Sequence, residues 1–334
     1  MGFKDDAMIF ALSSSKKFGE RIGYNAEATE MFFPDEEFRV HPDSSLDMKG
    51  KDVFVIQSIH KTFSVGGRPE LSTKLLQLLI FCDSAHRAGS ARITAVIPYF
   101  GFARQDRPTE TNDSESAKAT INFLKAAYVD RILAVDLHNP KITKDCGMPF
   151  YNLLLSKTLV EHLAPVFNEY DKFALIAPDK GAMDNRTGSL EAEVRRVYPD
   201  INLITGYAKK VRKSGSEIEC YGLELYGKSL KERATFTFDD ETVTGSTILN
   251  VGRLCKEAGA ATVIGGVSHC KASRESAQTI QKSDCLDRFI ISDTVSRSDN
   301  FFKEYPKIEE ISASGPVYAA IRDIHEHDFI SAQL

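Results

Sequence analysis

The 334-residue chain is long enough to bury a large core and, judged by length, to form about two domains. Its net charge of −5 and isoelectric point near 6.0 argue against general binding to nucleic acids or membrane surfaces. The six cysteines lack CxxC or zinc-like spacing, and no apolar run approaches a signal core or a membrane span. We therefore expect a cytoplasmic protein with buried thiols.

The first half of the chain alternates apolar runs with amphipathic segments. Leu71, Leu75 and Leu78 recur at helical spacing after a glycine-rich loop and predict a strong amphipathic helix. Near-continuous apolar strands alternating with helices are typical of a parallel α/β sheet. The expected strands are 8–12, 29–33, 37–40, 53–56, 93–97 and 132–135, with further helices ending near 22 and spanning about 116–127.

The second half repeats this rhythm and predicts a second domain of the same kind. The polar segment 209–226 has the alternation of a β-hairpin flap. Expected helices are 153–167, 190–197, 248–257, 273 onward and 315–324, and expected strands are 173–176, 203–204, 235–238, 262–267 and 289–291. We predict two similar doubly wound parallel-sheet domains, 1–148 and 149–310. A C-terminal helix and tail, 311–334, would be able to pack back on the first.

The stretch 234–249 is a strand, a polar loop and then a helix start, the place where a doubly wound sheet binds anions. Asp239 and Asp240, at the strand end, can accept hydrogen bonds from vicinal sugar hydroxyls. A hydroxyl-rich helix cap after an acidic turn is the alternative, but it leaves most of these side chains unexplained. The stretch favours a cradle for a pentose phosphate, whose phosphate ligands would be Thr242, Thr244, Gly245, Ser246 and Thr247.

Two arginines follow the strand 93–97 in a loop that suits a nucleotide triphosphate. A surface salt-bridge loop explains the segment equally well. The candidate residues are Arg104, Gln105, Asp106 and Arg107.

Two other strand ends carry candidate metal ligands. Asp136 and His138 follow the strand 132–135, although such a pair is more often structural. Asp179 beside Gly181 is a good ligand for a hard cation, or else part of a turn shaped by Pro178.

Four cations in five positions lie in the flap. A solvated face accounts for Lys209 and Lys213, whereas Lys210 and Arg212 share one side of an extended chain. These two side chains can stabilise a phosphoryl group in transfer.

These clusters, in this order, resemble the ribose-phosphate pyrophosphokinases, from Met8 to about Ile324. No single motif is decisive, but seven of them in the right order and spacing are specific. They are FPDEE (33–37), VFVIQS (53–58), FARQDR (102–107), DLH (136–138), PDKG (178–181), KVR (210–212) with Glu217 downstream, and DDETVTGST (239–247).

The resemblance implies diphosphoryl transfer from ATP to the anomeric hydroxyl of ribose 5-phosphate, giving phosphoribosyl pyrophosphate and AMP. It implies Mg²⁺ as cofactor and a homo-oligomer, either a dimer or a hexamer. The implied roles are ribose 5-phosphate binding for Asp239, Asp240, Thr242, Thr244, Gly245, Ser246 and Thr247; ATP binding for Arg104, Gln105, Asp106 and Arg107, with Phe33, Asp35 and Glu37 of a neighbouring subunit at the adenine; Mg²⁺ ligation for His138 and Asp179; and catalysis for Lys210 and Arg212.

Several positions depart from the family pattern. The loop 108–115 is acidic where members are longer and more basic, and Val243 stands where many members carry Asp and others Ser. Lys49, in place of a common Arg, and the C-terminal residues also depart from the family pattern, at positions linked to the family's phosphate/ADP regulatory site. One alternative is a catalytically silent regulatory subunit, which the intact catalytic motifs oppose. The other is a type I phosphoribosyltransferase, which would not explain the arginine loop.

Overall fold

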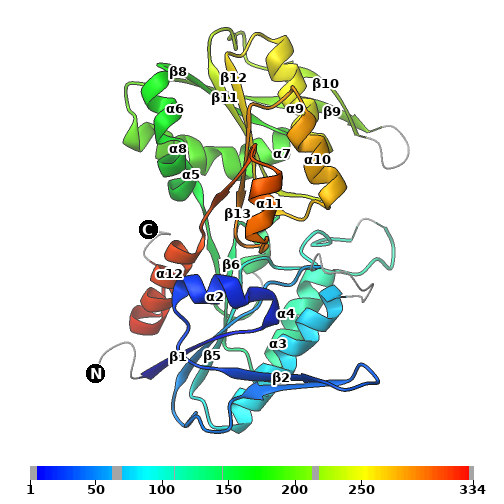
Figure 1. Cartoon of the computed structure of the whole chain (residues 1–334), viewed down its shortest axis with the longest axis vertical. Helices are drawn as coiled ribbons and strands as arrows, with labels where there is room; N and C mark the ends of the chain where they lie inside the picture. The colour runs from blue at the N-terminus through cyan, green and yellow to red at the C-terminus, as the bar shows by residue number, and fades with distance from the viewer. Residues whose placement is uncertain (1–5, 62–69, 109, 145, 213–217, 331–334) are drawn as a thin grey trace. The chain divides into compact units, whose positions relative to one another are not determined.

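The computed structural model describes residues 6–61, 70–108, 110–144, 146–212 and 218–330, which form two compact units (Figure 1). The first unit comprises Met1–Leu154, Thr294–Ser296 and Ala313–Leu334; the second comprises Leu155–Asp293 and Arg297–Ser312. Each has its own sheet and its own apolar core. The expected α/β class with two parallel-sheet domains is confirmed, while the boundaries at 148 and 310 stay a prediction.

The first unit is built on five parallel strands in the order β1-β4-β5-β6-β7. Helices cover both faces, which is why its central strands β4 and β6 are buried along their whole length and apolar after their first residue. α3 and α4 pack on the face that carries Val53 and Val55. On the other face, the ring of His325 in α12 lies 6.4 Å from that of Phe54. The elements are β1 (Ala7–Ala11), η1 (Ser13–Ser15), α2 (Lys16–Ile22), β4 (Asp52–Ile56), α3 (Glu70–Arg87), β5 (Arg92–Ile97), α4 (Ser116–Ala126), β6 (Arg131–Val135), η2 (Pro140–Thr143), β7 (Phe150–Leu153) and α12 (Ser314–His327).

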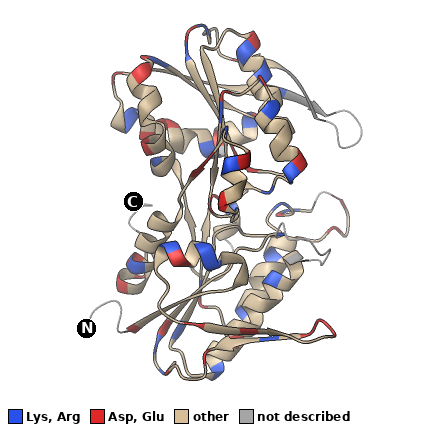
Figure 2. Ribbon diagram, viewed as in Figure 1, with Lys and Arg blue, Asp and Glu red and all other residues tan. Residues whose placement is uncertain are grey.

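A separate antiparallel hairpin, β2 (Ala28–Phe32) and β3 (Phe38–Pro42), belongs to the same unit and packs on α3. Its turn is closed by the N–H of Phe33, which donates to the carbonyl of Glu37 at 2.7 Å. Figure 2 shows acidic residues, coloured red, at its tip. The expected strand pair around residues 34–36 is confirmed.

The second unit has seven strands in the order β10-β9-β8-β11-β12-β13-β14, and only β10 runs antiparallel to its neighbour. α9 and α10 cover one face through an apolar stripe that includes Ile248, Val251 and Ile280. Phe167 of α6 packs on the other face, 4.6 Å from the ring of Phe173. The elements are α5 (Ser156–His162), α6 (Ala164–Glu169), β8 (Lys172–Ala177), α7 (Lys180–Ala182), η3 (Met183–Thr187), α8 (Gly188–Val197), β9 (Asn202–Arg212), β10 (Ile218–Glu224), β11 (Ala234–Thr242), α9 (Ser246–Glu257), β12 (Thr262–Cys270), α10 (Arg274–Lys282), β13 (Arg288–Ser292), α11 (Asp299–Glu304) and β14 (Ile308–Ile311).

Two expectations about the middle of the chain are wrong. The helix expected over 153–167 is preceded by β7 and divided into α5 and α6. Pro165 lies in the first turn of α6, where its missing N–H costs nothing, but it could not continue a longer helix. The short strand expected at 203–204 is the beginning of an 11-residue strand, β9, that runs on into the flap.

A buried network of charged side chains fixes α12 to the first sheet. Asp52 accepts hydrogen bonds from Arg131 at 2.6 Å and from Arg92 at 2.7 Å, and His325 Nδ1 lies 2.8 Å from its Oδ2 atom. Arg131 also donates to Asp328, the residue that ends α12, at 2.5 Å. The side chains of Asp52 and Arg131 are about 95% buried, so the charges compensate one another rather than being solvated.

We predict that Arg131→Ala lowers the free energy of unfolding by about 3 kcal/mol, because it removes the main counter-charge of a buried carboxylate. Urea denaturation followed by circular dichroism measures this loss. Arg87→Ala removes an exposed ion pair to Asp83 and should leave the midpoint almost unchanged. Equal midpoints for the two variants would contradict the role given to the network.

Candidate active site

The polar side chains of the second unit gather at the carboxyl edge of its sheet. β8 and β11 are parallel neighbours, paired as far as Ile176 and Thr237. Asp179 follows the end of β8, and Asp239 and Asp240 lie near the end of β11. All three therefore emerge at the same edge of the sheet. This is the edge at which open α/β sheets bind ligands.

Asp239 and Asp240 share one arginine. Arg186 Nη1 lies 3.3 Å from Oδ1 of Asp239, and its Nη2 lies 2.9 Å from Oδ1 of Asp240. All three side chains are largely buried, and Asp240 is only 4% exposed. Burial and the adjacent charge of Asp240 raise the pKa of Asp239 to about 7, while Arg186 opposes the rise. Asp239 therefore exchanges its proton near neutrality.

The loop after the acid pair is shaped by its own hydroxyls. Thr242 Oγ1 accepts from the N–H of Gly245 at 2.8 Å, and the hydroxyls of Thr244 and Ser246 are 2.9 Å apart. Gly245 has φ +82°, and a Cβ there would lie 2.9 Å from the side chain of Ile280, so only glycine fits. The loop leads directly into α9, whose N-terminus carries partial positive charge. Exposed hydroxyls at such a helix start suit a phosphate group.

Asp179 has a structural role of its own. Its Oδ1 accepts from the N–H of Ala182 at 2.8 Å and caps α7. The chain then forms the π-helical turn η3, which inserts one extra residue and carries Arg186. Both the turn and the ligand interpretation of Asp179 are compatible with this geometry, because a capping carboxylate keeps further lone pairs.

Lys210 and Arg212 lie near the end of β9, with the alternation expected of a strand. Their side chains, and Glu217 as a whole, lie outside the described residues. The neighbouring Lys209 is paired with Glu224 at 2.7 Å, as expected for a cation on a solvated face.

In the first unit, the arginine loop meets the end of β6. Asp106 accepts a hydrogen bond from the side-chain amide of Asn139, which directly follows His138. Asn139 also caps η2 by accepting from the N–H of Lys141 at 3.0 Å. The ATP-loop candidates and the candidate metal ligand His138 are thereby brought together.

The acidic loop 108–115 takes part in the same site. Gln105 donates to Asp113 at 2.5 Å and accepts from the hydroxyls of Ser114 and Ser116, both at 3.3 Å. Arg104 and Arg107 are exposed. Phe33, Asp35 and Glu37 lie at the exposed tip of the β2–β3 hairpin, so they are presented away from the core of their own unit.

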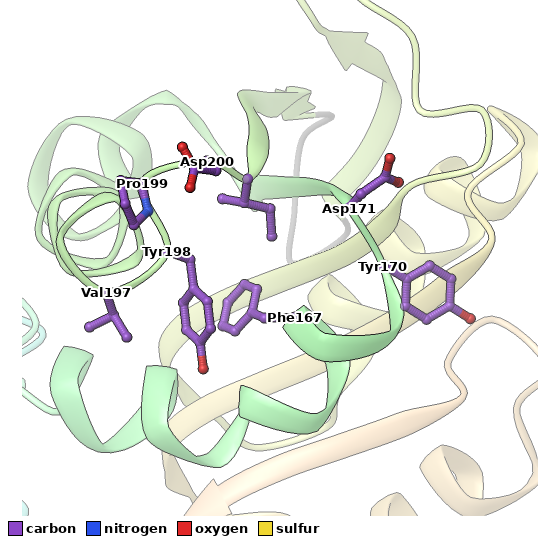
Figure 3. A pocket seen from close by; sticks show the side chains of 8 residues that line it. Phe167, Tyr170, Asp171, Val197, Tyr198, Pro199 and Asp200 are labelled. Atoms are coloured by element: carbon purple, nitrogen blue, oxygen red, sulfur yellow. The ribbon is translucent and has the colours of Figure 1, made fainter.

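A cavity of about 360 Å³ lies elsewhere in the second unit (Figure 3). Phe167, Tyr170 and Tyr198 line it together with Asp171 and Asp200. Asp171 directly precedes β8, whereas Asp179 follows it. The cavity is therefore at the amino edge of the sheet, opposite the candidate active site.

Residues 7–127 match the model of the N-terminal domain of ribose phosphate pyrophosphokinase. The ribose-phosphate pyrophosphokinase of Hyphomonas neptunium is 32% identical over 299 residues, covering 90% of this chain and 88% of that protein. The chain belongs to the ribose-phosphate pyrophosphokinase family.

Further relatives agree with this membership. The ribose-phosphate pyrophosphokinase of Prochlorococcus marinus is 29% identical over 328 residues, covering 96% of this chain and 91% of that protein. The crystal structure of phosphoribosylpyrophosphate synthetase from Mycobacterium smegmatis has the same fold, with a TM-score of 0.79 at 23% identity, and covers 96% of this chain and 99% of that chain. The described residues include no helix long and apolar enough to cross a membrane.

Sequence reasoning missed three residues that contact members of the candidate site: Arg186, Asn139 and Asp113. Each of them contacts a candidate residue from another part of the chain. Arg186 is 53 positions from Asp239, Asn139 is 33 from Asp106, and Asp113 is 8 from Gln105. A signal existed for Asn139 alone, because an asparagine before proline is a typical N-cap. The position of Val243 is now also defined: it is 44% exposed, in the loop between the acid pair and α9.

The raised pKa of Asp239 predicts a pH-dependent stability. Between about pH 4 and 7 the folded carboxyl holds a proton that the unfolded one releases, so stability falls as the pH rises through 7. Asp239→Asn removes this loss. Its unfolding free energy relative to wild type should therefore increase by at least about 1 kcal/mol between pH 5 and pH 8, given about 1.4 kcal/mol per pKa unit. Urea titrations measure these free energies. A difference between Asp239→Asn and wild type that is the same at pH 5 and pH 8 would contradict the raised pKa of Asp239.

Proposed function

We propose that the chain is an active ribose-phosphate diphosphokinase, which forms phosphoribosyl pyrophosphate and AMP from ATP and ribose 5-phosphate. The observation that carries the proposal is the carboxyl edge of the second sheet. An acid pair for a diol and a hydroxyl loop at a helix N-terminus lie in consecutive positions there. Membership of the family supplies the nucleotide substrate that this edge alone does not specify.

The proposed roles follow the charges of the site. Asp239 and Asp240 bind the ribose hydroxyls, and the loop from Thr242 to Thr247 binds the 5-phosphate. In the transfer, the anomeric oxygen bonds to the β-phosphorus, the bond from that phosphorus to the α,β-bridging oxygen breaks, and the hydroxyl proton is released. Lys210 and Arg212 of the flap would offset charge on the moving group.

The nucleotide half of the site is proposed for the first unit. Arg104, Gln105, Asp106 and Arg107 would bind ATP, and Phe33, Asp35 and Glu37 of a neighbouring subunit would bind its adenine. His138 and Asp179 would hold Mg²⁺, which neutralises phosphate charge. The carboxylate of Asp179 is the kind of ligand that Mg²⁺ takes, with substrate phosphates and water in its remaining positions. We further propose a cytoplasmic homo-oligomer, either a dimer or a hexamer; the exposed Met31, Phe32 and Phe33 favour a contact at the hairpin tip.

A catalytically silent regulatory subunit is the second candidate, and Val243 is the observation that favours it. An exposed valine occupies the loop position where many family members carry a carboxylate. Incubation with Mg-ATP and ribose 5-phosphate decides between the two. The active enzyme forms AMP in step with phosphoribosyl pyrophosphate. Absence of AMP at every protein concentration would favour the silent subunit.

Lys210→Ala should lower kcat at least a hundredfold while ribose 5-phosphate binding stays within about threefold of wild type, because the lysine acts on the transition state. Lys209→Ala is the matched control, since Lys209 is exposed and paired with Glu224. Steady-state kinetics and calorimetric titration measure the two effects. A large loss of ribose 5-phosphate affinity in Lys210→Ala would refute the assigned role.

A further inference from the structure

We propose that Arg186 is a positioning residue of the sugar site, which orients Asp239 and Asp240 as acceptors for the vicinal hydroxyls of a sugar phosphate. This inference rests on the proposed function, because it deepens the role of the same acid pair. It concerns a residue that no motif of the sequence singled out.

The first support is geometric. Arg186 contacts both carboxylates at once, at 3.3 Å and 2.9 Å, and its side chain is only 13% exposed. A buried guanidinium that bridges two adjacent carboxylates fixes the rotamers of both. Asp239 is further fixed by the N–H of Asp240, which donates to its Oδ1 at 3.0 Å.

The second support is the way in which the chain delivers this arginine. Asp179 caps α7, and the π-helical turn Met183–Thr187 follows at once. The extra residue of a π turn shifts every following side chain around the helix axis, and such turns are frequent at functional sites. Here the shift brings Arg186 from the end of β8 to the acid pair on β11.

The third support is electrostatic. Two neighbouring buried carboxylates repel, so one takes up a proton unless a cation is close. Arg186 is the cation that lowers the pKa of Asp239 against burial and the charge of Asp240. A protonated Asp239 would offer fewer acceptor positions to a diol. Other charged or titratable groups near the carboxyl ends of β8, β11 and β12 include Asp179, Asp184, Glu241, His269, Cys270 and Lys271. Glu241 and Lys271 pair with each other at 2.7 Å.

The test compares wild type with Arg186→Gln, Arg186→Lys and the matched control Arg195→Gln. Arg195 is an exposed arginine of α8 paired with Glu191. Ribose 5-phosphate binding is titrated by calorimetry from pH 6 to 8.5, and Tm is measured over the same range. At pH 7.5 we expect Arg186→Gln to bind ribose 5-phosphate at least tenfold more weakly than wild type. The affinity of Arg186→Lys should stay within threefold of wild type, and that of Arg195→Gln should not change. We also expect the Tm difference between wild type and Arg186→Gln to widen as pH rises, because the acid pair then ionises without its cation.

Unchanged binding in Arg186→Gln would overturn the proposal. So would weaker binding with a Tm difference that does not vary with pH, because the arginine would then contact the ligand rather than control the acids. The Tm arm requires no catalytic activity. A widening Tm difference in a protein that forms no AMP would uphold the control of the acid pair while refuting the proposed diphosphokinase.

Discussion

Two adjacent carboxylates buried at the end of a parallel strand need a positive charge beside them, and this requirement organises the second unit. Arg186 meets it by bridging Asp239 and Asp240. The arginine reaches them only because β8 lies next to β11 and the π turn after α7 redirects its side chain. The hydroxyl-rich loop follows the same acids within a few residues, so the proposed diol and phosphate ligands lie at one strand end.

The fold could be predicted from the sequence because its central strands are buried on both faces and therefore mainly apolar. β5, β6 and β8 follow that pattern after a basic first residue, and the long helices show amphipathic spacing. β7 was not predicted because its four residues, Phe-Tyr-Asn-Leu, are too few to show a periodicity of their own. The attachment of α12 could not be predicted either, since it depends on Asp52 meeting Arg131 and Asp328 across distant parts of the chain.

The candidate site likewise contains residues that could be predicted from local sequence patterns and residues that could not. The acid pair and the phosphate loop lie within nine consecutive residues, so strand, loop and helix signals locate them together. Arg186, Asn139 and Asp113 come from other segments, and their roles follow from side-chain pairing rather than from local pattern. A π turn also defeats helical periodicity, so no 3.6-residue spacing could place Arg186. Asp113, in the acidic stretch after the arginine loop, accepts a hydrogen bond from Gln105, one of the proposed ATP ligands.

The central claim is that the carboxyl edge of the second sheet holds a pentose phosphate, with its diol on the acids and its phosphate on the loop. A crystal structure of the protein with ribose 5-phosphate tests this most directly. The account predicts the 2- and 3-hydroxyls within hydrogen-bonding distance of Asp239 and Asp240, and the phosphate on the residues from Thr242 to Thr247 at the start of α9. A sugar phosphate bound in the reverse orientation, or away from this edge, would contradict it.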